Sequence, residues 1–225
     1  MKHPSLVIYG IHPVLEALRT GRVIALHMSD RRDARTAEIL RLAAERGTPV
    51  QRVPTAALNQ ATRGAVHQGV MAELSGPHER SVSDLVREAV AAPLLVVLDG
   101  VEDPQNFGAI LRTADAAGAD GVVQQTRRAA PLSAAAAKAS AGAIAHVKIT
   151  SVVNIVRAVE ELKAAGVWTV GLAGGASRRY DTVDLTLPTA LVVGAEGTGL
   201  RRLVRERCDW LVSIPMRGAV ESLNV

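Results

Sequence analysis

The stretch from residue 94 to residue 119, LLVVLDGVEDPQNFGAILRTADAAGA, constrains the fold more than any other part of the sequence. Residues 94–98 are apolar and rich in β-branched side chains, the pattern of a parallel strand covered on both faces. Pro104 suits a first helical turn, Asn106 is a capping residue type, and apolar residues then recur at helical spacing. The stretch therefore predicts a strand, a polar loop and a helix within an α/β domain that has a mostly parallel sheet.

The loop of this unit is the first candidate for a functional site. In an open α/β sheet, ligands bind at the carboxyl ends of strands, where residues 99–106 must lie. Helical spacing places Arg112 inside the helix but away from its apolar stripe. Two structural alternatives stay open here: Asn106 as an ordinary helix cap and Arg112 as a partner in a surface salt bridge. The loop also carries three acidic residues, Asp99, Glu102 and Asp103.

The rest of the sequence alternates predicted strands and helices in two groups. The composition becomes polar after residue 74, which predicts a domain boundary near Gly76 and two domains, residues 1–76 and 77–225. In the first domain, strands are expected at residues 5–9, 23–28, 50–53 and 67–74, and helices at residues 11–19, 36–46 and 55–61.

The second domain contains an Ala-rich segment, residues 129–145, which we interpret as a buried helix because Ala is the best helix former and permits close packing. Other helices are expected at residues 152–165 and 200–207. Further strands are expected at residues 121–124, 146–149, 167–172, 191–193 and 210–215.

Charge is divided unevenly between the two domains. Residues 1–76 contain ten Lys or Arg and six Asp or Glu, whereas residues 77–225 contain sixteen of each. The basic first domain favours a polyanionic partner such as RNA, although a solvated basic face is the alternative. Aromatic residues make up only 2% of the chain, so base stacking on aromatic platforms is not expected to dominate.

Several classes of protein are disfavoured by composition. The single cysteine allows no intramolecular disulfide, and the six histidines show no metal-ligand spacing. No apolar run reaches the length of a membrane span, and the N-terminus lacks the plan of a signal peptide. We therefore expect a cytoplasmic protein with no metal and no membrane partner.

Three loops that follow predicted strands should meet at one edge of the sheet: residues 173–175, 194–199 and 216–224. The second, GAEGTG, has glycines that let backbone approach a ligand and offer amide donors. Its glutamate is unsuited to a phosphate cradle, and no dinucleotide fingerprint opens either domain, so an NAD-dependent enzyme is a weak alternative. A neutral or cationic ligand is favoured.

Three ordered motifs resemble the SpoU-type RNA ribose 2′-O-methyltransferases of the SPOUT superfamily. They are EDPQNFGAILRTA at residues 102–114, GAEGTG at residues 194–199, and Ile214-Pro-Met followed by Ser222-Leu-Asn-Val. The segments IYGIHPVLEAL and HQGV resemble the L30e-like substrate-binding domain of members that methylate a guanosine of large-subunit (23S) ribosomal RNA. Together the resemblance covers nearly the whole chain.

The resemblance implies an α/β catalytic domain with a deep trefoil knot, S-adenosylmethionine as cofactor within that knot, ribosomal RNA as substrate and a homodimer. Family members continue after Ser-Leu-Asn-Val into a helix that completes the knot and the dimer face. The sequence given stops at Val225, so residues 77–225 do not include that helix, and the tail either lies beyond the sequence given or has been cut off. If the chain truly ends at Val225, we expect the cofactor pocket to lack a wall.

The same resemblance assigns site residues. The cofactor would be held by Gly194, Ile214, Leu223, Met216 and Ala173. The reaction-site positions would be Arg112, Asn106, Glu196, Ser222 and Asn224.

The implied chemistry is methyl transfer to a ribose 2′-hydroxyl. Because a sulfonium methyl is a strong electrophile, positioning and late proton removal suffice. A guanidinium keeps its charge in proteins, so we favour Arg112 as a clamp on the adjacent phosphate that polarises the hydroxyl, oriented by Glu196; a role as base requires that burial depress its pKa. The alternatives are an RNA-binding or ribosome-assembly protein without turnover and a transfer-RNA ribose methyltransferase.

Overall fold

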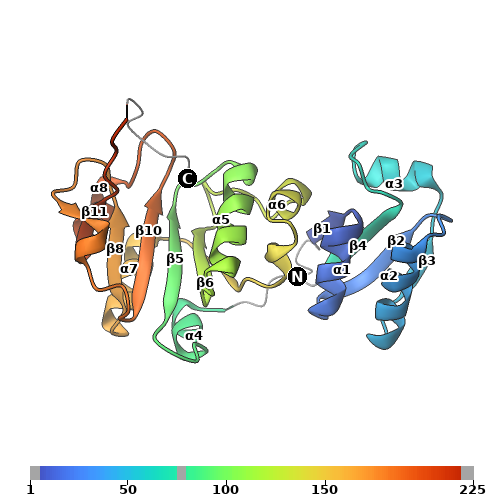
Figure 1. Cartoon of the computed structure of the whole chain (residues 1–225), viewed down its shortest axis with the longest axis horizontal. Coiled ribbons are helices and arrows are strands. Elements are labelled where there is room, and N and C mark those ends of the chain that lie inside the picture. The colour runs from blue at the N-terminus through green and yellow to red at the C-terminus, as the bar shows by residue number, and fades with distance from the viewer. Residues whose placement is uncertain (1–5, 75–79, 219–225) are drawn as a thin grey trace.

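The computed structural model describes residues 6–74 and 80–218 and arranges them around two sheets (Figure 1). The first sheet has the strand order β1-β4-β2-β3, in which β2 and β3 are parallel and β4 is antiparallel to both of its neighbours. Its strands are β1 (Leu6–Tyr9), β2 (Val23–Met28), β3 (Val50–Arg52) and β4 (Val70–Leu74). Its helices are α1 (Ile11–Arg19), α2 (Ala34–Glu45) and α3 (Thr55–Ala61).

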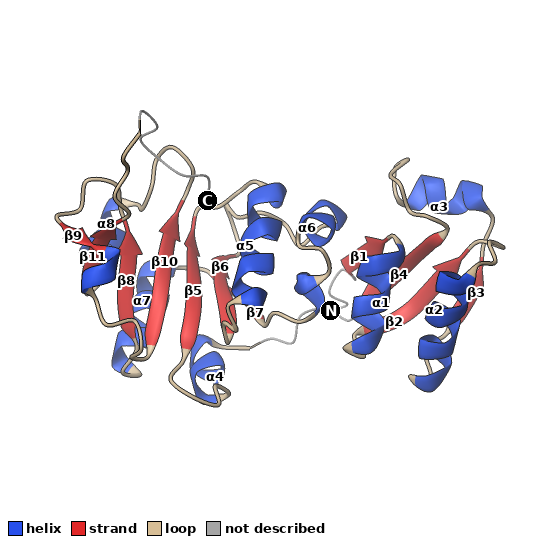
Figure 2. Cartoon of the chain, viewed as in Figure 1, coloured by secondary structure: helices blue, strands red, loops and turns tan. Residues whose placement is uncertain are grey.

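The second sheet is parallel at every pairing and has the order β7-β6-β5-β10-β8-β11-β9 (Figure 2). Its strands are β5 (Leu94–Asp99), β6 (Gly121–Gln125), β7 (Ile149–Val152), β8 (Trp168–Leu172), β9 (Arg178–Arg179), β10 (Thr189–Gly194) and β11 (Trp210–Ser213). Its helices are α4 (Val82–Arg87), α5 (Pro104–Ala116), α6 (Ala134–Ala139), α7 (Ile155–Ala164) and α8 (Arg202–Arg207), with 3₁₀ turns η1 (Ala143–Ala145) and η2 (Tyr180–Thr182). The prediction of a mostly parallel α/β sheet is confirmed.

Helix α5 begins as the sequence predicts, with Pro104 at its first position. The cap, however, is Asp103, whose carboxylate accepts a hydrogen bond from the Gln105 backbone nitrogen at 2.8 Å. Asn106 lies within the first turn and is buried. The alternative of Asn106 as an ordinary helix cap is therefore wrong.

The Ala-rich segment is only partly buried and does not form the one buried helix that the sequence predicted. Residues 134–139 form α6, and the chain then turns through Ala141 and Gly142, which both have positive φ, before η1. Gly108 of α5 permits close packing here, because a Cβ at that position would lie 2.6 Å from the Ala136 carbonyl oxygen. Small side chains thus serve to bring α6 against α5.

The first sheet and its helices dock on this Ala-rich region. Arg22 Nη1 donates hydrogen bonds to the carbonyls of Ile144, at 2.8 Å, and Ala145, at 3.3 Å. His146 Nε2 lies 3.1 Å from Glu16 Oε2. Burial, with the nearby charge of Arg80, lowers the pKa of Arg22 from its usual value. One apolar cluster runs through both sets of elements, which makes the first sheet part of a shared core.

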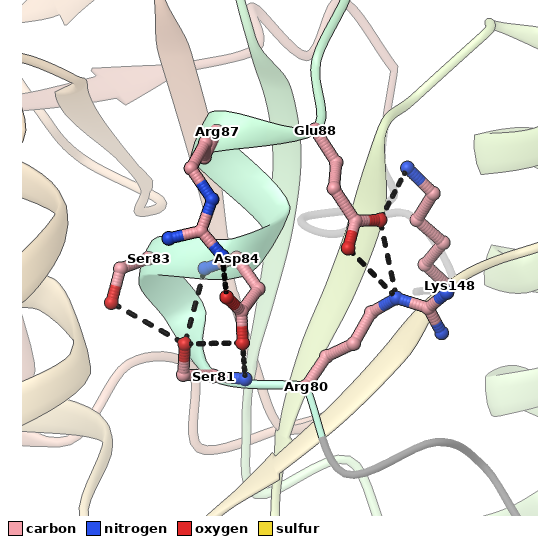
Figure 3. Close-up of polar contacts among 7 residues, drawn as sticks. All are labelled: Arg80, Ser81, Ser83, Asp84, Arg87, Glu88 and Lys148. Atoms are coloured by element: carbon pink, nitrogen blue, oxygen red, sulfur yellow. Dashed lines mark hydrogen bonds and ion pairs between the residues drawn. The ribbon is translucent and has the colours of Figure 1, made fainter.

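The second sheet is entered through α4, whose first turn is a capping box (Figure 3). Ser81 Oγ accepts from the Asp84 nitrogen at 3.1 Å, and the Asp84 carboxylate accepts from the Ser81 nitrogen at 2.9 Å. Beyond the helix, Glu88 bridges Lys148, at 3.0 Å, and Arg80, at 3.2 Å. The hydrogen bond from Lys148 holds the pKa of Glu88 below its usual value, and the bridge ties α4 to the start of β7.

Some expectations fall outside these residues or are corrected by them. Gly76, the expected domain boundary, is not among the described residues, and the knot stays a prediction because residues 219–225 are not described either. The strand expected at residues 146–149 is displaced to β7, and the strand expected at residues 67–74 begins only at Val70. None of the helices in the described ranges is long and apolar enough to cross a bilayer.

Candidate active site

The second sheet brings the predicted loops to one edge. Strands β5, β10, β8 and β11 are consecutive in the sheet and parallel, so their carboxyl ends lie together. The loops at residues 99–103, 194–199 and 173–175, and the segment from residue 214 to residue 218, therefore emerge side by side (Figure 1). This is the edge at which ligands bind in open α/β sheets.

Asn106 and Glu196 meet at this edge although they are far apart in the sequence. Asn106 Nδ2 donates a hydrogen bond to Glu196 Oε2 at 3.0 Å. Both line a pocket of about 250 Å³ between the loops that follow β5 and β10. The other lining residues are Gly100, Val101, Glu102, Asp103 and Ala195. The carboxylate of Glu196 thus fixes the direction of the Asn106 amide at the mouth of the pocket.

Asp99 holds the end of the loop at residues 194–199 against β5. It is fully buried at the end of β5, and its carboxylate accepts hydrogen bonds from Arg201 through the backbone nitrogen, at 2.8 Å, and through Nε, at 2.6 Å. Arg201 in turn donates to Gln125 Oε1 at 2.9 Å. The sequence places Asp99 in the candidate loop but predicts no role for Arg201 or Gln125. The available signal was a carboxylate placed directly after an apolar strand, which needs a partner when buried.

Replacing Asp99 with alanine is expected to lower the free energy of unfolding by about 2 kcal/mol, because it removes the partner of Arg201 and frees the loop from β5. This loss is smaller than for a fully buried ion pair, since the Arg201 side chain is half exposed. Thermal unfolding measures the loss. Arg202→Ala is the matched control, because it breaks only an exposed pair with Glu206. Equal melting temperatures for Asp99→Ala and the wild type would show that Asp99 does not hold the loop.

Arg112 is not brought to this pocket. It is exposed on α5, and six residues separate it from Asn106, which on a helix amounts to about 9 Å of rise and a different face. Across residues 6–74 and 80–218, Arg112 makes neither an ion pair nor a side-chain hydrogen bond, so a surface salt bridge has no support there. The hypothesis that Glu196 orients Arg112 also has no support, since Glu196 engages Asn106.

Gly194 is buried at the end of β10, and its environment explains why it is glycine. A Cβ there would overlap the backbone of Gly199 and Leu200, where the loop folds back and pairs through Ala195 and Gly199. The glycine is thus needed for loop closure. The glycine pattern of the loop had predicted a different reason, close approach of the backbone to a ligand.

The apolar residues predicted for the cofactor lie at the same edge. Ile214 and Met216 are 44% and 38% exposed, which is high for large apolar side chains. Ala173 follows β8, and its backbone nitrogen donates to the Val212 carbonyl at 2.9 Å. Apolar surface beside loop backbone suits the adenine of S-adenosylmethionine, so these residues fit that cofactor in their chemistry. Ser222, Leu223 and Asn224 lie outside the described residues.

The single cysteine is unsuited to act as a nucleophile. Burial raises the pKa of the Cys208 thiol to about 11, and its Sγ lies 3.3 Å from the Val204 carbonyl oxygen. A thiol with that pKa is protonated at neutral pH, whereas nucleophilic cysteines react as thiolates.

Known proteins are similar to this chain in sequence and in fold. A sequence model of the SpoU rRNA Methylase family matches residues 93–225, and a model described as RNA 2′-O ribose methyltransferase substrate binding matches residues 7–80. The 23S rRNA (guanosine-2′-O-)-methyltransferase RlmB of Photobacterium profundum is 42% identical over 224 residues, which is 97% of this chain and 91% of that protein.

Two solved structures extend the comparison. The SpoU methyltransferase AviRb from Streptomyces viridochromogenes, in complex with the cofactor AdoMet, aligns with a TM-score of 0.82 and 27% identity over 98% of this chain and 84% of that one. An AdoMet-bound rRNA methyltransferase from Sinorhizobium meliloti aligns with a TM-score of 0.81 and 28% identity over 98% and 82%. The chain therefore belongs to the SpoU rRNA Methylase family.

Proposed function

We propose that this protein transfers a methyl group from S-adenosylmethionine to the ribose 2′-hydroxyl of a guanosine in 23S ribosomal RNA. The observation that carries the proposal is the Asn106–Glu196 pair, which joins the first and second family motifs in one pocket at the carboxyl edge of the parallel sheet. The identity of 42% to RlmB over 97% of the chain supports the choice of substrate.

The cofactor, when bound, supplies an electrophilic methyl group. We propose that the loop closed by Gly194 offers backbone groups to it, while Ile214 and Met216 cover its adenine. Ala173, on the neighbouring loop, and Leu223, by its match to the third motif, complete the set.

The remaining residues act on the RNA. Glu196 holds the Asn106 amide in one direction, which suits Asn106 to position the ribose. Arg112, which is exposed, is proposed as the clamp on the phosphate next to the reacting hydroxyl. Ser222 and Asn224 match reaction-site positions of the third motif and are proposed to contact the same ribose.

The assembly is proposed from the same resemblance. The protein would act as a homodimer, without a metal ion, with a trefoil knot in the domain of residues 77–225 and an RNA-binding domain at residues 1–76. Two observations support the assignment of RNA binding to the first domain. The substrate-binding model matches residues 7–80, and the positive charge is concentrated in the first domain.

Incubation with labelled S-adenosylmethionine and unmodified 23S ribosomal RNA tests the function, followed by alkaline hydrolysis. A 2′-O-methyl group removes the nucleophile that cleaves its own phosphodiester, so the label should appear in a resistant dinucleotide. Label in single nucleotides would exclude ribose methylation. Transfer RNA in parallel tests the transfer-RNA alternative. RNA binding without any response to S-adenosylmethionine would favour an assembly protein.

The basic first domain should make RNA binding strongly dependent on salt. Arg32 and Arg35 are exposed, and within the described ranges neither pairs with a carboxylate. Replacing both with glutamine should reduce the slope of log K against log salt by roughly 0.7 to 0.9 for each arginine that contacts a phosphate. Filter binding at several salt concentrations measures the slope. The control is Arg157→Gln with Arg207→Gln in the second domain; an equal loss of slope in both proteins would contradict the assignment.

A further inference from the structure

A second pocket, of about 500 Å³, lies at one end of the first sheet. It shares no lining residue with the Asn106–Glu196 pocket, which belongs to the second sheet. It is formed where the parallel strands β2 and β3 end, by residues 29–31 and 53–55, and by residues 65–69 before β4. Its volume is in the range of small-molecule sites, about 300 to 1,000 Å³. The pocket thus lies at the carboxyl ends of two parallel strands, the place where ligands bind in open α/β sheets.

Hydrogen bonds between the loops make this pocket a preformed structure. The Ser29 nitrogen donates to the Gly69 carbonyl at 2.9 Å, and Arg52 Nη1 donates to the Ser29 carbonyl at 2.5 Å. Gln68, which has a positive φ, accepts from the Ile11 nitrogen at 2.9 Å and so ties the third loop to the start of α1. The loops are held before any ligand arrives, which lowers the entropic cost of binding.

His67 orients one polar group of the pocket. The Gly69 nitrogen donates to His67 Nδ1 at 3.0 Å, so this ring nitrogen accepts and the proton resides on Nε2. Nε2 then donates to Asn59 Oδ1 at 2.9 Å. His67 is buried, whereas Asn59 is exposed and lines the pocket. With its oxygen engaged, Asn59 presents its amide nitrogen as a donor, and His67 is a positioning residue.

The rest of the lining is mixed in a way that indicates one kind of ligand. Val66 is 74% exposed at the rim, and Pro54 adds a second apolar surface. Arg31 places a guanidinium at the pocket; its Nε donates to Asp33 Oδ2 at 2.6 Å, and its terminal amino groups are the donors offered to a ligand. The neighbouring Asp30 supplies an acceptor. Phosphate alone would not need an apolar wall or tolerate the carboxylate. An unpaired nucleotide uses all of these groups: the apolar surface for the base face, donor and acceptor for its edge, and the guanidinium for its phosphate.

We propose that this pocket binds a single unpaired nucleotide of the RNA substrate, at a position different from the nucleotide that is methylated. The inference rests on the proposed function, because it takes an RNA as the substrate. It assigns the HQGV segment, residues 67–70, a role in substrate selection: a paired base in an A-form helix cannot enter the pocket, so RNA with an extruded base at the correct distance is selected.

The test uses the full chain and a complete, unmodified 23S ribosomal RNA transcript. Val66→Asp places a charge on the apolar wall, and Asn59→Leu removes the donor without a change in net charge. We expect each to weaken RNA binding in a filter assay by about tenfold and to raise KM for RNA similarly, as the loss of one base contact should. The kcat value and the affinity for S-adenosylmethionine should stay within about twofold of the wild type, because the pockets are separate.

Val90→Asp is the matched control, since Val90 is fully exposed and precedes the amino end of β5, away from both pockets. It should bind RNA as the wild type does. If folded Val66→Asp and Asn59→Leu bind RNA as tightly as the wild type does, and the wild type methylates the RNA, the inference is overturned and the proposed function stands. Wild-type binding without methylation would refute the proposed function and leave the binding comparison valid. Unchanged binding to the transcript with lost binding to ribosomal particles would identify a protein ligand and also overturn the inference.

Discussion

Alanine in place of Arg112 is expected to lower kcat by between about a hundredfold and about a thousandfold, the range for loss of one group that stabilises charge in a transition state. Affinity for S-adenosylmethionine should be nearly unchanged, because Arg112 does not line the pocket of Asn106 and Glu196. Single-turnover methylation and calorimetry measure the two quantities. Arg207→Ala, which removes an exposed arginine beside the amino end of β11, should affect neither.

Lysine at position 112 separates the two roles that the sequence left open. A clamp should be only partly restored, because an ammonium lacks the planar fork that binds two phosphate oxygens. A base should recover activity as pH rises toward the lysine pKa, about 10 when unperturbed. The exposed position of Arg112 favours the clamp, since burial was the condition for deprotonation. Near-normal turnover in Arg112→Ala would exclude both roles.

Local patterns in the sequence were sufficient for many of the elements. The bounds of α1, β2 and α3 agree with the predicted ones, and α5 begins at the predicted Pro104, because each has a clear apolar period and a Gly, Pro or polar residue at its ends. The Ala-rich segment shows the limit of such patterns. Its helix ends at Ala139, and the chain turns through Ala141 and Gly142 beside Glu16 of α1. A contact between residues so far apart in the sequence cannot be predicted from local periodicity.

The site shows the same limit more strongly. The resemblance to the SpoU-type enzymes implied that Asn106 and Glu196 belong to one site, but their hydrogen bond spans 90 positions and requires β10 to insert beside β5. The sequence order of the strands does not determine that neighbour. The anchor formed by Asp99 and Arg201 depends on the same insertion. The partners of Asn106 and Asp99 therefore depend on the strand order of the folded sheet and could not be predicted from the sequence.

Valine in place of Gly194 is expected to abolish measurable cofactor binding and to lower the melting temperature by several degrees. The added side chain would overlap Gly199 and Leu200, so the loop cannot close on β10. A forced steric change of this kind costs about 3 kcal/mol, and each kcal/mol shifts Tm by about 2 to 4 °C at this chain length. Calorimetry with S-adenosylmethionine and thermal unfolding without it measure the two effects.

Gly174→Ala provides the control for this substitution, because Gly174 lies in the neighbouring loop and a Cβ there meets nothing within 4 Å. It should unfold at the wild-type temperature. The paired measurements on Gly194→Val distinguish two reasons for the glycine. Lost binding with an unchanged Tm would mean that the glycine serves contact with the cofactor, as the sequence alone suggested, and would contradict loop closure. Lost binding together with a lowered Tm is the result that the geometry of Gly199 and Leu200 requires.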